Sequence, residues 1–325
     1  QGHEELGIHL DKKNKEIVYR EWAPSAFEIF LLGDFNNWER KLHPLEKKEY
    51  GIWEIRLPMS EFPPEKLHGT HFKVLVHGKN GWNERIPAYI RRVVQDDDTK
   101  IFSAQFWFPE AFDWQGDNYS PASVDSPFIY EAHVGMGQEE ERVGTYREFA
   151  DNILPMIKDK GYNVIQLMAI AEHPYYGSFG YHVSNFFAPS SRFGTPEDLK
   201  YLVREAHKLG LGVIMDIVHS HTVKNINEGL NEWDGTVEQY FHVGDRGNHP
   251  SWDSKLFDYG KIEVIRFLLS NLRYWLEEFH FDGFRFDGVS SMMYWHHGNI
   301  EFSSPHDYFS DGVEYDAITY LQLAN

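Results

Sequence analysis

Hydrophobic and polar residues alternate with a period of two in the first third of the chain. Short runs of this kind, separated by turn-rich stretches, occupy residues 17–19, 27–31, 53–57 and 72–76. Successive side chains of a strand point to opposite faces, so this alternation is typical of half-buried strands. We therefore expect an all-β sandwich over residues 1–105.

The pattern changes after residue 105. Residues 106–127 are rich in Pro, Gly, Asp and Trp and show no sustained period. Such a composition is typical of a linker that lies across a neighbouring surface. We expect this linker to join the sandwich to a second domain over residues 128–325.

Near-continuous apolar strands alternate with amphipathic helices in this second domain. We expect strands at 128–131, 164–170, 212–216 and ending at Asp287, and helices at 145–160, 195–209 and 262–279. The second helix has the clearest boundary signals, because Thr195 is a good cap, Pro196 suits the first turn and Gly210 follows the end. Strands and helices in this order indicate a parallel sheet covered on both faces.

Two folds contain such a sheet, the (β/α)8 TIM barrel and the doubly wound sheet. A doubly wound sheet more often has a glycine-rich phosphate turn, and the segment 135–137 lacks its third glycine. The barrel is favoured because Asp216 and Asp287 end their strands and long loops follow the strands. Only four βα units are visible, and a closed barrel needs about 250 residues. We therefore expect the first half of a barrel, from the front part of a longer enzyme.

Arg285 and Asp287 share one face of the last expected strand, while Phe284 and Phe286 share the other. A buried carboxylate is costly unless it is paired, so the guanidinium is the expected partner of Asp287 and would keep it ionised. The pair could be a structural ion pair or part of an active site at the carboxyl end of the strand.

A second polar group follows the strand at 212–216. Asp216 ends this strand and His221 follows five residues later, so both could face the same pocket. The spacing of His219 and His221 also suits a metal, but no third ligand follows, and we expect hydrogen-bonding histidines instead. The aromatic and glycine-rich loop at 172–182 would lie over the same edge, where its rings could stack on a ligand or simply pack the loop.

Composition narrows the range of partners. The chain has 31 Lys and Arg against 50 Asp and Glu, a net charge of −19, which disfavours nucleic acid and anionic membranes. Cysteine is absent, so disulfides and thiolate metal sites are excluded. No stretch approaches the eighteen or so apolar residues of a membrane span, and we expect a soluble protein. Aromatic residues make up 16% of the chain, which is typical of sugar-binding proteins although aromatic rings also fill cores.

Several motifs resemble one known family. The segments 186–198, 216–221 and 283–287 are similar to the α-amylase family, glycoside hydrolase family 13. Within it, the segments 128–135, 252–257 and 287–294 resemble the glycogen and starch branching enzymes of the eukaryotic type. The segments 22–24 and 32–38 resemble the family 48 carbohydrate-binding module that precedes the barrel in these enzymes.

The resemblance implies a role for each candidate residue. Asp287 would be the nucleophile that forms a covalent glucosyl intermediate, and Arg285 would keep it ionised and oriented. Asp216 would fix the arginine side of this network, His221 would hydrogen-bond the reacting sugar, and Tyr181 would lie beneath that sugar. Retaining glycosyl transfer also requires an acid/base carboxyl about 5 Å from the nucleophile.

The acid/base glutamate and a further aspartate of the family follow later strands. Glu301 and Glu314 do not lie in a matching motif. We therefore expect residues 1–325 alone to lack the general acid and to be inactive.

The implied activity is cleavage of an α-1,4-glucan (amylose, amylopectin or glycogen) and reattachment of the segment through an α-1,6 linkage. We expect no cofactor and no metal, since calcium, which some relatives bind, has no clear ligand set here. A monomer in the cytoplasm is favoured, with the plastid as the other compartment. Two alternatives remain: a hydrolase of the same family, such as a debranching enzyme or amylase, or a non-catalytic glucan-binding protein that uses Trp38 or Trp53.

Overall fold

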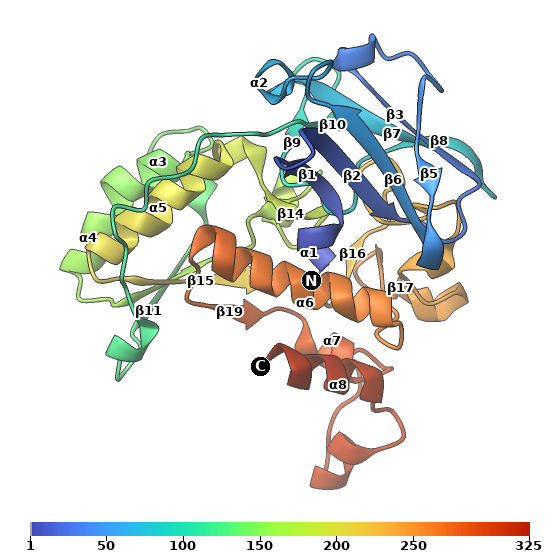
Figure 1. Ribbon diagram of the computed structural model, residues 1–325. Helices are drawn as coiled ribbons and strands as arrows, with labels where there is room; N and C mark the ends of the chain where they lie inside the picture. The colour runs from blue at the N-terminus through green and yellow to red at the C-terminus, as the bar shows by residue number, and fades with distance from the viewer. Residues whose placement is uncertain (1) are drawn as a thin grey trace.

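The N-terminal part of the chain is a sandwich of two antiparallel sheets. The structure is a computed structural model that describes residues 2–325, and Figure 1 shows the sandwich in blue and cyan above the rest of the molecule. The first sheet contains, in order of pairing, β1 (Gly7–Asp11), β2 (Glu16–Trp22), β6 (Ile52–Pro58) and β5 (Glu46–Lys47). The second contains β4 (His43–Pro44), β3 (Glu28–Gly33), β7 (His71–Gly78), β10 (Phe102–Gln105) and β9 (Val93–Gln95), with β8 (Gly81–Arg85) paired to β7. The short helices α1 (Gly2–Glu5) and α2 (Pro64–Leu67) flank these sheets.

The alternating residues of the strands form the core between the two sheets. Ile17 and Tyr19 of β2 point inward, as do Phe72, Val74 and Val76 of β7, and all five are buried. Facing apolar side chains of the two sheets exclude water from the space between them, as in other aligned sandwiches. The strands expected from the period of two in the sequence thus have one face buried between the two sheets.

Four parallel strands form the central sheet of the second part. They are, in order of pairing, β11 (Ile129–Ala132), β12 (Val164–Leu167), β15 (Gly212–Ile217) and β19 (Gly283–Phe286). This order follows the sequence without reversal, whereas a doubly wound sheet changes direction between its halves. The arrangement is that of the first part of a (β/α)8 barrel, as the sequence predicts.

Helices lie between these strands and after the last of them. They are α3 (Tyr146–Glu148) and α4 (Leu154–Asp159), joined by a π-helical turn (Phe149–Ile153), then α5 (Pro196–Lys208), α6 (Ile262–Phe279), α7 (Val289–Met293) and α8 (Tyr315–Ala324). Pro155 explains the π-helical turn, because it has no N–H for the carbonyl four residues earlier. At the start of α5, Thr195 accepts from the backbone N–H of Asp198 and Asp198 accepts from that of Thr195, which completes the predicted cap.

Two small antiparallel sheets extend the loops of the barrel part. They are formed by β13 (Ala171–Glu172) with β14 (Asn185–Pro189), and by β16 (Thr222–Val223), β18 (Ser254–Lys255) and β17 (Asn248–His249). Among residues 2–325, no helix has the length and apolar character required to span a bilayer.

The sandwich docks on the loop between β16 and β17. The guanidinium of Arg85, fully buried, donates to the carbonyl oxygens of Gly229, Asn231 and Glu232 at 2.8–3.1 Å. Trp233 donates from its indole nitrogen to the carbonyl of Ile86 at 2.7 Å. These contacts and a shared apolar core fix the sandwich against the barrel part.

Residues 106–127 cross from β10 to the start of β11 over the outside of the helices (Figure 1). Asp117 lies 2.6 Å from Nδ1 of His207 and 3.2 Å from Nδ1 of His280. The rings of Trp114 and His280 stack at 3.7 Å. This segment is therefore held against the ends of α5 and α6.

Candidate active site

The carboxyl ends of β15 and β19 bring two carboxylates to one guanidinium. Asp216 pairs in register with Arg285 across the two strands, and Asp287 follows directly after β19. Nη1 of Arg285 lies 3.1 Å from Oδ2 of Asp216 and 2.9 Å from Oδ1 of Asp287. A single nitrogen thus bridges the two carboxylates and fixes their relative positions.

The two carboxylates differ in exposure. The side chain of Asp216 is fully buried, whereas that of Asp287 is 22% exposed. Burial raises the pKa of Asp216, although the hydrogen bond from Tyr181 and the charge of Arg285 act in the opposite direction. Asp287 is therefore the carboxylate that a ligand can reach, and Asp216 supports it from behind.

The last strand is less buried than its sequence suggests. Arg285 is exposed, and Phe284 and Phe286 are only half-buried, although both rings pack against the core. The reason is that β19 lies at the edge of the four-stranded sheet. The expectation of a buried strand was wrong for this part of the chain, while the expected shared face of Arg285 and Asp287 agrees with their hydrogen bond.

Tyr181 joins this group from the loop after β13. Its hydroxyl donates to Oδ2 of Asp216 at 2.5 Å, and burial together with this carboxylate raises the pKa of the phenol. Gly180 makes this placement possible: its φ is +91°, and a Cβ there would lie 1.8 Å from the carbonyl oxygen of Ala169. The tight turn before Tyr181 therefore requires glycine.

Gln166 is a member of the group that the sequence analysis missed. Its amide nitrogen donates to Oδ1 of Asp216 at 2.8 Å. The signal was present, because Gln166 is the only polar residue in the apolar run 164–170. Asp216 therefore receives hydrogen bonds from three sides, which compensates for its burial.

His221 lies behind Tyr181 and is only 2% exposed. Nε2 lies 2.8 Å from the carbonyl oxygen of Tyr181, and Nδ1 lies 2.9 Å from Oγ of Ser220. Burial lowers the pKa of His221 to about 4, so the ring is neutral and donates to that carbonyl. In this structure His221 holds the backbone of Tyr181, and both ring nitrogens have protein partners.

His219 lies in the core rather than at the site. Its Nδ1 contacts the hydroxyl of Tyr320 at 2.5 Å and its Nε2 lies 2.9 Å from the amide oxygen of Asn271. Among residues 2–325, the one group of three metal-ligand side chains close to one another is His3, Glu4 and Glu277, between α1 and α6. His219 and His221 thus point to different partners and share no ligand position.

A buried ion pair fixes the start of the loop that carries Tyr181. Glu172 is fully buried and accepts from Arg192 at 3.2 Å and from the backbone N–H and hydroxyl of Ser191. Arg192 also donates to the carbonyl oxygens of His173 and Pro174. The sequence analysis did not identify this pair, whose members are twenty residues apart.

The two tryptophans of the sandwich that were considered as sugar-binding residues differ in their exposure to solvent. Trp53 is 4% exposed and donates from its indole nitrogen to the carbonyl of Ala23, so the expectation that it could face a glucan was wrong. Trp38 is half-buried beside the small outer cluster of Phe30, Leu32 and Leu75. Only Trp38 of the two has an accessible ring.

Two family models match the chain. Residues 5–90 match carbohydrate-binding module 48, the isoamylase N-terminal domain, and residues 128–259 match the catalytic domain of α-amylase.

Curated relatives match over nearly the full chain. The 1,4-alpha-glucan-branching enzyme of Yarrowia lipolytica is 53% identical over 98% of this chain and 47% of its own length. The enzyme of the same name from Dictyostelium discoideum is 51% identical over 100% of this chain and 48% of its own length. A chloroplastic/amyloplastic form from Oryza sativa is 54% identical over 98% and 40%. The chain thus spans about half the length of the curated relatives it matches.

Solved structures show the same fold at lower identity. The catalytic module of the pneumococcal glycogen-degrading virulence factor SpuA superposes with a TM-score of 0.74 at 21% identity, covering 98% of this chain and 49% of that one. A pullulanase of Group B Streptococcus in complex with maltotetraose superposes with a TM-score of 0.71 at 22% identity, covering 88% and 42%.

Proposed function

The chain belongs to the α-amylase family, glycoside hydrolase family 13, with a family 48 carbohydrate-binding module ahead of its barrel, and from this membership we propose that it is part of a glucan-branching transferase. The reaction would cleave an α-1,4 linkage of amylose, amylopectin or glycogen and transfer the released segment to a 6-hydroxyl group. The observation that carries the proposal is the bridge of Arg285 between Asp216 and Asp287 at the strand ends.

Asp287 is the proposed nucleophile. Its carboxylate oxygen attacks C1 of the donor sugar, the bond from C1 to the leaving oxygen breaks, and an acid/base carboxyl protonates that oxygen. The 6-hydroxyl oxygen of an acceptor then attacks C1 from the other face and loses its proton to the same carboxyl. Two inversions retain the α configuration, and Asp287 leaves as a free carboxylate.

Three neighbours have proposed supporting roles. Arg285 keeps the attacking carboxylate of Asp287 oriented through the hydrogen bond from its Nη1 at 2.9 Å. Asp216 holds the other side of that guanidinium. Tyr181 lies under the reacting sugar, and its ring is fixed by Asp216 from the hydroxyl and by His221 from the backbone.

The acid/base carboxyl is proposed to come from outside residues 1–325. Glu314 is paired with Arg246, and Glu301 is exposed on a loop. Neither makes a hydrogen bond to Arg285 or Asp287. Residues 1–325 alone are then inactive, and the branching reaction belongs to the longer protein.

The same proposal includes the roles of the domains, the partners and the cellular compartment. Residues 1–105 act as the glucan-binding module, 106–127 as the linker and 128–325 as the first half of the barrel. The substrate is a neutral glucan, nucleic acid and membranes are not partners, and the enzyme acts as a monomer. The cytoplasm is the proposed compartment, with the plastid as the alternative on the precedent of the rice relative's name.

Proton NMR of linear amylose tests the proposal. The protein that contains residues 1–325 together with the remainder of its barrel is incubated with amylose, and α-1,6 anomeric signals are counted against new reducing ends. We expect α-1,6 signals without an equal gain of reducing ends. Reducing ends alone would identify a hydrolase and overturn branching.

A matched pair of variants tests the site. Asp287→Asn replaces the nucleophilic oxygen at nearly constant shape, and transfer is expected to fall to background. Asp98→Asn makes the same change at an exposed position in the loop between β9 and β10 and should leave the reaction as it is. Activity of Asp287→Asn near that of the unsubstituted enzyme would refute the assignment of the nucleophile.

A further inference from the structure

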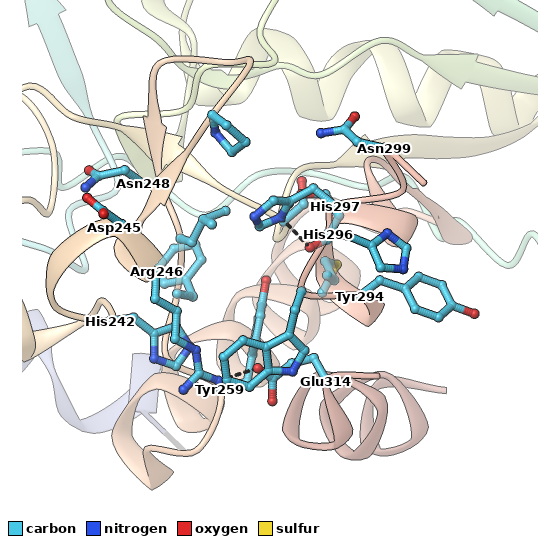
Figure 2. A pocket seen from close by; sticks show the side chains of 17 residues that line it. His242, Asp245, Arg246, Asn248, Tyr259, Tyr294, His296, His297, Asn299 and Glu314 are labelled. Atoms are coloured by element: carbon cyan, nitrogen blue, oxygen red, sulfur yellow. Dashed lines mark hydrogen bonds and ion pairs between the residues drawn. The ribbon is translucent and has the colours of Figure 1, made fainter. Parts of the chain in front are cut away.

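A cavity of about 380 Å³ lies beside the proposed active site, between the segments 242–248 and 294–299. Figure 2 shows His242, Asp245 and Arg246 on one side and His296 and Asn299 on the other. The volume is within the range of sites that bind small molecules, roughly 300–1,000 Å³. None of the residues proposed above for catalysis lines this cavity.

The cavity and the proposed catalytic centre share a wall. Ser220, which lines the cavity, directly precedes His221, and Ser291 lies four residues after Asp287 on α7. Gly288 packs tightly against Ser220, since a Cβ on Gly288 would lie 2.6 Å from the hydroxyl oxygen of Ser220. The cavity therefore lies directly beside the segment that follows Asp287.

Trp295 lines the cavity with an aromatic ring that is fixed in place. The ring is 50% exposed, and the guanidinium carbon of Arg246 lies 3.7 Å from its centroid. Arg246 is itself paired with Glu314, and the backbone N–H of Trp295 donates to the carbonyl of Gly312 at 2.8 Å. One face of the indole is thus covered and the ring is held before any ligand binds, which reduces the entropy cost of binding.

The polar groups around Trp295 suit a neutral ligand with many hydroxyl groups. In the part of the chain that the structure describes, no hydrogen bond is made by the side chains of Asp245 and Asn299, so they can pair with ligand hydroxyls. The only lysine or arginine that lines the cavity is Arg246, whose charge is balanced by Glu314. Among residues 2–325, the cavity therefore has no unpaired lysine or arginine to bind an anionic ligand. A sugar, in contrast, can place its C–H groups against the indole ring of Trp295 and hydrogen-bond the surrounding polar side chains with its hydroxyl groups.

A row of side-chain contacts separates the cavity from Tyr181. His221 holds the carbonyl of Tyr181, and its ring lies 4.9 Å from that of Trp252. Trp252 stacks on His249 at 3.9 Å, and His249 lies 4.8 Å from His297, which lines the cavity. The ring under the donor sugar and the cavity thus lie at opposite ends of this row, and one sugar cannot occupy both.

We propose that this cavity, with Trp295 as its stacking ring, is a subsite for the acceptor α-glucan. This inference rests on the proposed function, because it assigns the chain that receives the transferred segment. In a double displacement the acceptor enters after the leaving chain has gone and competes with water for the glucosyl intermediate. A subsite that retains the acceptor therefore favours transfer over hydrolysis.

The subsite can be tested with a donor whose leaving group is fluoride instead of a glucan chain. The full-length enzyme is supplied with a maltooligosyl fluoride as donor and maltohexaose as acceptor, and fluoride release, transfer product and reducing sugar are measured separately. Trp295→Ala is expected to require about tenfold more maltohexaose for half-maximal transfer, which corresponds to the loss of about 1.4 kcal/mol of binding. It should also raise the share of donor that ends as reducing sugar.

Three further variants control for folding and for general loop effects. Trp295→Phe keeps a ring and should restore most of the transfer, and Asn299→Ala should weaken acceptor use without removing a buried side chain. Phe309→Ala lies on the same loop, is 82% exposed and does not line the cavity, so it should behave as the unsubstituted enzyme does.

The outcomes separate this inference from the function on which it rests. Normal fluoride release with the same acceptor requirement in Trp295→Ala and Asn299→Ala would overturn the acceptor subsite alone. Slower fluoride release in both variants without acceptor would overturn it as well, because the cavity would then serve the donor. No fluoride release by the unsubstituted full-length enzyme would overturn the proposed function together with the subsite.

Discussion

The hydroxyl oxygen of Tyr181 lies 2.5 Å from Oδ2 of Asp216, so an aromatic ring on a loop is tied to the end of a buried strand. The same carboxylate oxygen accepts from Arg285 at 3.1 Å. Asp216 thus links the ring proposed to lie beneath the sugar with the guanidinium that orients Asp287. The position of each depends on the other two.

Removing the hydroxyl of Tyr181 should slow turnover more than it weakens binding. A hydrogen bond to a charged group contributes about 1.5–3 kcal/mol, so Tyr181→Phe in the full-length enzyme is expected to lower kcat roughly tenfold or more. Tyr181→Ala also removes the ring and should lower kcat further, with a smaller change in KM. Steady-state kinetics on amylose measure both constants. An unchanged kcat in Tyr181→Ala would assign the ring to loop packing.

Arg285→Lys should impair the site although the charge is kept. Lysine is a point charge on a flexible chain and does not hold one nitrogen rigidly between the two carboxylates, as the planar guanidinium of Arg285 does with Nη1. We expect kcat to fall about 100-fold or more, as for the loss of other preorganised donors. Circular dichroism should show the same fold as the unsubstituted enzyme. Arg40→Lys, on an exposed pair with Glu84, is the matched control.

The linker segment should stabilise the protein in a manner that depends on pH. Burial alone would lower the pKa of His207, but its hydrogen bonds to Asp282 and Asp117 outweigh burial and raise it. The stabilisation is therefore complete below the unfolded value of about 6.5 and is lost as pH rises through the folded pKa. Thermal unfolding between pH 6 and pH 8 should show this loss.

Asp117→Asn should reduce the same pH dependence. The substitution removes the carboxylate charge that favours the protonated form of His207. It should lower the free energy of unfolding at pH 6 by about 1.5–3 kcal/mol. Asp113→Asn is the control, because Asp113 lies on the same segment and its side chain accepts from the backbone N–H of Gln115, while its contact with Arg204 is made by the backbone carbonyl and is kept. Equal pH profiles for the Asp117 variant and the unsubstituted protein would show that this contact does not contribute.

Arg85 should be essential to the docking of the sandwich. Arg85→Met removes the guanidinium donors of three carbonyl groups at the interface, those of Gly229, Asn231 and Glu232. The carbonyl of Glu232 still accepts from the backbone N–H of Gly235 at 3.0 Å, whereas those of Gly229 and Asn231 lose their donor. The expected loss is about 3–5 kcal/mol in the free energy of unfolding, measured by urea denaturation. Arg40→Met removes an exposed partner of Glu84 and should cost less than about 1 kcal/mol.

The features that were predicted correctly from the sequence depend on residues close together in the chain. The helix at 262–279 has the predicted bounds, and the cap at Thr195 depends on Asp198, three residues away. Arg285 and Asp287 are two positions apart on one strand, so alternation alone was enough to expect their contact.

The features that the sequence did not reveal depend on contacts between distant segments. Gln166 and Asp216 are fifty residues apart, and Glu172 meets Arg192 only after the loop between them has closed. Alternation places Trp53 on one of two faces but does not say which face is covered, and the core face is the one it occupies. Local sequence patterns do not show which distant segments meet in the fold. For this reason the neighbours of the two carboxylates were not predicted.

The position of β19 at the edge of its sheet has a consequence for the order of folding. Its outer side carries backbone N–H and C=O groups without a neighbouring strand in the described chain, as does the outer side of β11. Such edges pair readily with other chains. A ribosome releases the sandwich first, and its two sheets can close on each other at once. The edges of the four-stranded sheet can pair with other chains as soon as β19 has been made, so we expect chaperones to bind the nascent chain more strongly after β19 than after the sandwich.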